Sequence, residues 1–71
     1  MGIIKKEYTN NYEYKMKITK REEDSFEIMI MQENSPKVLY YNRNANFAEV
    51  LDFAKMYYFS VDQIYSDFLK N

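Results

Sequence analysis

The side chains that most often carry catalysis are missing from this sequence. It contains no histidine and no cysteine, so the commonest general base and the best side-chain nucleophile are both absent. The same absence excludes a disulfide and a zinc site built from cysteine and histidine. The one glycine is at position 2, which excludes a glycine-rich phosphate-binding loop. We therefore expect a protein that is not an enzyme and that uses no cofactor.

Carboxylates are the remaining side chains that could bind a metal ion or transfer protons. Glu22, Glu23 and Asp24 are consecutive, and in principle such a group could hold Mg²⁺ or Ca²⁺. A metal cage, however, needs ligands that converge from a defined loop geometry. We favour the simpler interpretation that these residues form the solvated tip of a hairpin, and we predict no metal site.

Two tyrosine doublets, Tyr40-Tyr41 and Tyr57-Tyr58, could serve recognition. Exposed aromatic rings beside lysines suit the stacking of nucleic-acid bases on a sheet. Alternatively, the rings fill a small core and keep their hydroxyl groups at its edge. We favour the second interpretation, because glutamates share the expected face and would repel phosphate.

Length and charge limit the class of protein. The 71 residues, with a formal net charge of −1, allow one domain over 1–71 and argue against a dedicated nucleic-acid binder, which usually carries a basic excess. The first residues lack the apolar region of a signal peptide, and no apolar run approaches the roughly 20 residues of a membrane span. We expect a cytoplasmic protein without membrane contact. Its richness in Asn, Lys, Ile and Tyr is typical of AT-rich genomes, such as those of low-GC bacteria and their phages.

Alternating apolar and polar residues predict three strands, over 12–19, 25–32 and 37–42. In the first strand Tyr12, Tyr14, Met16 and Ile18 share one face. The charged segment 20–24 is expected to be a hairpin loop, and 34–36, which ends in proline, a turn. Residues 3–8 are expected to form either a fourth, edge strand or a loose arm.

The strand over 25–32 is apolar on both faces, which is typical of the centre of a sheet. Phe26, Ile28 and Ile30 point one way, and Met29 and Met31 the other.

After residue 45 the period of the apolar residues becomes helical. Asn46 is a good N-cap with Glu49 three residues later, and Ser60 precedes Gln63 in the same way. These patterns predict helices over 47–58 and 61–70, with one kinked helix as the alternative. The fold class is therefore α+β, in two layers: an antiparallel β-meander packed on one or two C-terminal helices.

This packing leaves the second face of the sheet apolar at its centre and charged at its rim. The residues expected there, and hence the candidate partner-binding residues, are Lys15, Lys17, Glu27, Met29, Met31 and Tyr41. The sequence leaves three possibilities for what covers this face: the N-terminal segment or second helix of the same chain, a second copy in a homodimer, or another partner.

The expected function is that of a small non-catalytic protein-binding module, an inhibitor or regulator of a cellular protein, as in phages or mobile elements. Tyr, Phe and Met are abundant here and are favoured at interfaces. The alternative is a nucleic-acid-binding domain that uses the sheet face.

Overall fold

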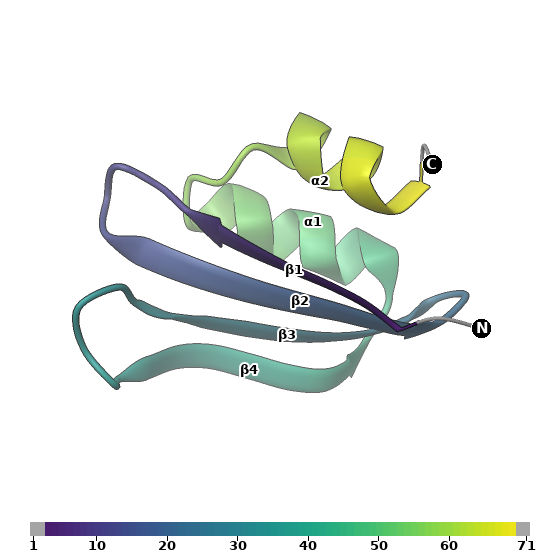
Figure 1. Cartoon of the computed structure of the whole chain (residues 1–71), viewed down its shortest axis with the longest axis horizontal. Coiled ribbons are helices and arrows are strands. Elements are labelled where there is room, and N and C mark those ends of the chain that lie inside the picture. Colours follow the sequence, from purple (N-terminus) through teal and green to yellow (C-terminus); the bar gives the residue numbers. More distant parts are fainter. Residues whose placement is uncertain (1–2, 70–71) are drawn as a thin grey trace.

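The chain forms four strands followed by two helices in the computed structural model, which describes residues 3–69 (Figure 1). The strands pair in sequence order, and every pairing is antiparallel. The predicted α+β meander is therefore confirmed, and the segment near the N-terminus forms the fourth, edge strand. The elements are β1 (Ile4–Thr9), β2 (Tyr14–Glu22), β3 (Ser25–Gln32), β4 (Val38–Ala45), α1 (Phe47–Met56) and α2 (Val61–Leu69).

One face of the sheet, the helix face, is buried beneath both helices (Figure 1). The even-numbered apolar residues of β2 and β3 point to it, and all of them except the partly exposed Tyr14 have no exposed surface. They contact Val50 and Ala54 of α1 and Ile64 and Phe68 of α2 within one core. Each large apolar side chain buried in this way contributes about 1.5–3 kcal/mol to folding. The residues that β2 and β3 bury here are Met16, Ile18, Phe26, Ile28 and Ile30.

The capping residues predicted from the sequence begin both helices. The Asn46 side chain accepts a hydrogen bond from the Glu49 N–H, and the Glu49 carboxylate accepts one from the Asn46 N–H, at 2.8 and 2.9 Å. Before α2, the hydroxyl oxygen of Ser60 accepts a hydrogen bond from the Gln63 N–H at 3.3 Å. These bonds satisfy backbone donors that have no partner within the helix.

Two helices form rather than one kinked helix, because α1 ends in a Schellman motif. The Tyr58 N–H donates to the Lys55 carbonyl and the Phe59 N–H to the Ala54 carbonyl. Tyr58 takes the left-handed backbone position, with φ of 70°, where glycine is usual. The turn directs Phe59 into the core, where it is 7% exposed. The predicted end of the second helix, Lys70, lies outside the described residues.

Several sequence predictions were wrong at the ends of elements. The charged segment 20–24 was expected to be a loop, but β2 continues to Glu22 and only a tight turn remains. Tyr12, expected in a strand and in the core, is 61% exposed in the β1–β2 turn. Helical spacing also places Tyr58, the last residue of the predicted helix over 47–58, on one apolar stripe with Phe47 and Val50, but Tyr58 lies beyond the end of α1 and is 62% exposed. The rings of Tyr12 and Tyr58 instead contact each other, with centroids 4.4 Å apart.

Three polar contacts fasten the helices to the sheet. The Asp24 carboxylate, in the β2–β3 turn, accepts a hydrogen bond from the first N–H of α1, at Phe47. The Tyr8 hydroxyl of β1 donates to Asp67 of α2 at 2.7 Å, and burial together with this bond raises the pKa of Tyr8. At the other end of the sheet, Asn10 joins the β1–β2 turn to the α1–α2 turn.

The Asn10 side chain makes hydrogen bonds on both sides. Its oxygen accepts from the Tyr12 and Tyr14 N–H groups, and its amide nitrogen donates to the Tyr57 and Tyr58 carbonyls. The shortest of these bonds, to the Tyr57 carbonyl, is 2.8 Å long. One side chain thus fixes the turn of a hairpin and the position of the linker between the helices.

We expect Asn10→Ala to lower the free energy of unfolding by about 1–3 kcal/mol, because two partly buried and two exposed hydrogen bonds to the backbone are lost. Urea unfolding followed by circular dichroism measures this change. The matched control is Asn11→Ala, since Asn11 is exposed and lies in the same turn. Equal losses of stability in the two variants would contradict this role of Asn10.

Candidate functional site

The second face of the sheet, here called the open face, is not covered by either helix. Its side chains form three rows across the strands, because residues directly opposite each other in antiparallel strands share a face. Arg21 and Arg43 lie beside the third row, where both act electrostatically on Glu27. Read from β1 to β4, the rows are Thr9, Lys15, Met31 and Val38; Glu7, Lys17, Met29 and Tyr41; and Lys5, Thr19 and Glu27.

The open face divides into an apolar half and a basic half. Over β3 and β4 lies the apolar quartet, Met29, Met31, Val38 and Tyr41; both methionines are half-buried, whereas Val38 is 47% and Tyr41 46% exposed. Over β1 and β2 lies the lysine group, which consists of Lys5, Lys15 and Lys17. The sequence predicted an apolar centre with a charged rim, whereas the structure has an apolar half beside a charged half; exposed apolar surface next to charged side chains is typical of contact surfaces.

All six candidate residues predicted from the sequence lie on the open face, and the structure brings them into two adjoining rows and the end of the third. Simple alternation along the predicted strand over 37–42 places Val38 on the same side as Tyr40, and this prediction is wrong. A register irregularity in the β3–β4 pairing, between Ile30 and Met31, places Val38 opposite Met31. Tyr40 stays on the helix face, where its ring stacks on Phe53 at 3.8 Å.

Sequence reasoning missed four further charged residues of this face: Lys5, Glu7, Arg21 and Arg43. Arg21 lies in the segment that was expected to be a loop, and Arg43 lies beyond the predicted end of its strand. Lys5 and Glu7 would have followed from the alternation of 3–8 if that segment had been assigned to the sheet. The register irregularity at Val38 has no signal in the sequence.

A polar network closes one end of the open face. The Glu27 carboxylate accepts hydrogen bonds from the Tyr41 hydroxyl at 2.5 Å and from the Arg21 guanidinium at 2.6 Å. The Tyr41 hydrogen bond and the neighbouring arginines lower the pKa of Glu27 below its ordinary value of 4.5. The same hydrogen bond raises the pKa of Tyr41. The network therefore holds the Tyr41 ring in one position at the rim of the apolar quartet.

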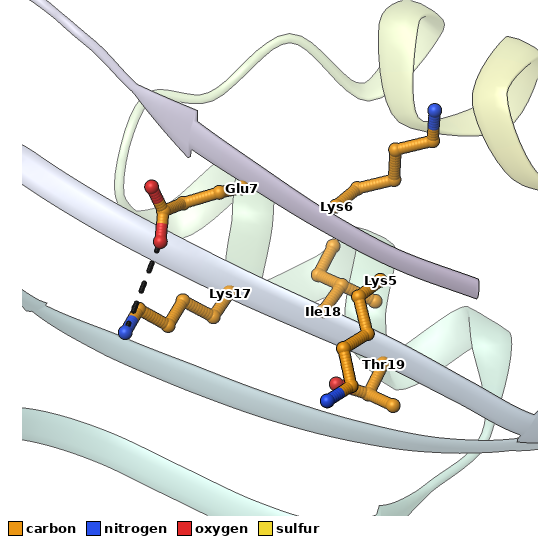
Figure 2. A pocket seen from close by; sticks show the side chains of 6 residues that line it. All are labelled: Lys5, Lys6, Glu7, Lys17, Ile18 and Thr19. Carbon is orange, nitrogen blue, oxygen red and sulfur yellow. Dashed lines mark ion pairs between the residues drawn. The ribbon is translucent and has the colours of Figure 1, made fainter. Parts of the chain in front are cut away.

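A shallow hollow of about 340 Å³ lies along β1 and β2, beside the lysine group (Figure 2). Lys17 in this hollow forms an ion pair with Glu7, with 3.8 Å between nitrogen and oxygen. The side chains of Lys5 and Lys15, by contrast, make no hydrogen bond or ion pair with any residue in 3–69. Figure 2 shows Lys5 and Lys6 pointing in opposite directions, Lys6 toward the side of α2.

Acidic residues border the open face at the ends of the strands. Glu13 and Glu33 follow the first row, where the Glu33 N–H donates to the Glu13 carbonyl. Glu22 lies at the other end, opposite Ser25. All three glutamates are exposed. Along the direction of the strands, the lysine group therefore lies between acidic residues at both ends.

The cluster Glu22, Glu23 and Asp24 does not form a cage. Asp24 accepts the hydrogen bond from Phe47 that begins α1, and within residues 3–69 no three acidic side chains converge as metal ligands would.

The N-terminal segment and the second helix were the two parts of the same chain that could have covered the open face, and neither lies over it. The N-terminal segment is β1, an edge strand of the sheet itself, and α2 packs on the helix face. A second copy and another partner therefore remain as covers. Among the described residues, no helix combines the length and the apolar character needed to cross a membrane.

Comparison with known proteins gives no relatives. No protein-family model matches this chain, and neither do any curated protein sequences or solved structures.

We expect Tyr41→Phe to raise the pKa of Glu27, because the substitution removes the hydrogen bond that contributes most to lowering it. Carboxyl-detected NMR titration measures this pKa, and Tyr65→Phe, which alters another exposed tyrosine, is the control. Because the pKa of Glu27 is lower in the folded chain, its contribution to stability is present above pH 4.5 and is lost as the pH falls further. An unchanged Glu27 titration in Tyr41→Phe would show that this hydrogen bond is absent in solution.

Proposed function

We propose that this protein is a small non-catalytic module that binds another protein through its open face and thereby inhibits or regulates it. The observation that carries the proposal is the apolar quartet, placed on a sheet face that no described segment covers. Methionine side chains are flexible and polarizable, so they adapt to a partner's surface. Tyr41 supplies a rigid aromatic ring of the type that is enriched among energetically important interface residues.

The two faces of the sheet differ in how fully their apolar side chains are buried, and this difference supports the proposal. The helix face holds all of the fully buried apolar residues of β2 and β3. The methionines of the open face therefore contribute less to the core, and their partial exposure costs solvation free energy that a partner could recover. We further propose that the protein acts in the cytoplasm, as a phage or mobile-element accessory protein would.

We expect Met29→Thr with Met31→Thr to abolish partner binding while the fold persists. Threonine keeps strand propensity and the charge of the chain, and it removes the apolar surface. The measurement is affinity capture from an extract of the source cell, with quantitative mass spectrometry of the retained proteins. Circular dichroism and thermal unfolding establish that the variant is folded.

The matched control for that experiment is Tyr65→Thr with Leu69→Thr, which removes exposed apolar surface from α2 instead. A protein retained by the native chain and the α2 variant, but lost from the methionine variant, supports the proposal. Retention of the same protein by the folded methionine variant would show that the binding surface lies elsewhere.

Binding of single-stranded nucleic acid is the second candidate, because Lys5 and Lys15 are without partners in the described chain and Tyr41 stands beside Met29. Within residues 3–69, the rows of this face include one aromatic ring, that of Tyr41, and its hydroxyl donates a hydrogen bond to Glu27. Electrophoretic shift of a single-stranded oligonucleotide at two salt concentrations tests this candidate, since phosphate contacts weaken steeply with salt.

A further inference from the structure

The division of the open face into an apolar half and a basic half indicates the chemistry of its partner. We infer that the open face binds a short acidic amphipathic segment of a protein, about two to three helical turns long, and this inference rests on the proposed function. The apolar side of the segment would lie on the apolar quartet, and its carboxylates would face the lysine group. The acidic bordering residues would define the ends of the contact.

Charge complementarity favours carboxylates on the partner. Lys5 and Lys15 have no ion-pair partner among the described residues, whereas both acidic groups of the three rows are already neutralised. Glu7 is paired with Lys17, and Glu27 with Arg21 and Tyr41. An approaching anion therefore meets lysines that are free to pair, and an approaching cation meets carboxylates that are already paired.

The dimensions of the face limit the length of the partner. Strands are about 4.8 Å apart and rise about 3.3 Å per residue, so the rows cover roughly 15 Å in each direction. A helix of about ten residues has the same length. An apolar stripe and an acidic stripe on adjacent sides of such a helix would match the two halves of the face.

The bordering glutamates disfavour a longer polyanion. A nucleic-acid strand that ran along the sheet would carry phosphates past Glu13 and Glu33 at one end or past Glu22 at the other, and like charges would repel. A short segment that ends within the rows avoids these contacts.

A second copy of the chain fits the face less well. Two open faces stacked on each other would bring lysines against lysines, or lysines against the apolar quartet of the other copy. The first arrangement is repulsive, and the second buries charges without partners, which is costly.

An unbiased peptide selection tests the inference with the folded chain. The immobilised protein is used to select from a phage-displayed library of random 16-residue peptides, and the affinities of enriched peptides are then measured by fluorescence anisotropy. We expect the enriched peptides to be acidic, with apolar residues at helical spacing. Raising the salt concentration should weaken their binding.

Two charge-reversal variants locate the contact. Lys5→Glu with Lys15→Glu should weaken binding of the enriched peptides at least about tenfold, a loss of about 1.4 kcal/mol in binding free energy. The matched control, Lys6→Glu with Lys55→Glu, changes the net charge equally without altering the open face, and should leave the affinity within about threefold. Circular dichroism confirms that both variants fold.

The outcomes separate this inference from the proposed function. If the enriched peptides are neutral or basic but still require Met29 and Met31 for binding, the inference of an acidic partner is wrong. The proposal that the open face binds protein then still holds. Peptides that bind the methionine variant equally well, or a selection that enriches none, would contradict the open face as a protein-binding surface. Tight binding of a random single-stranded oligonucleotide in place of peptides would assign the lysine group to nucleic acid.

Discussion

The fold depends on the contact between one face of the sheet and the two helices. Because side chains alternate along a strand, a slip of one residue in the register would exchange the two faces. Phe26, Ile28 and Ile30 have no exposed surface in the observed register, whereas the alternative would place Glu27 in the core. Burying that carboxylate without partners costs several kcal/mol, a large part of the stability of so small a domain. The core therefore fixes which residues face outward.

The features that could be predicted from the sequence are those with a local physical cause. The alternation in β3 gave its bounds, and the capping residues Asn46 and Ser60 gave the starts of both helices. The wrong predictions concern choices that local patterns do not decide. Charged residues suggested a loop at 20–24, yet strand pairing extends through most of that segment because the opposite strand supplies hydrogen-bond partners. Tyr58 fits a helical stripe, but the Schellman motif takes it out of the helix.

The candidate site was predictable only in part, for the same reason. Met29 and Met31 follow from alternation within one strand, and Lys15 and Lys17 from alternation within another. Their grouping depends on pairing between strands, which a single sequence does not specify. Val38 lies beside the methionines because of a register irregularity. Lys5 lies beside the other lysines because the edge strand β1 pairs with β2. The division of the face into an apolar and a basic half thus arises at the level of the sheet.

This division follows from how a two-layer fold uses its apolar residues. The outer strand β1 and its neighbour β2 carry lysines on the open face, where charged side chains at an edge also discourage pairing with another chain. The inner strand β3 carries methionines there, although solvent reaches them, and β4 adds Val38 and Tyr41. Folding alone requires an apolar helix face and a polar open face. The apolar quartet exceeds that requirement, and this surplus of partly exposed apolar surface is the physical ground for proposing a binding role.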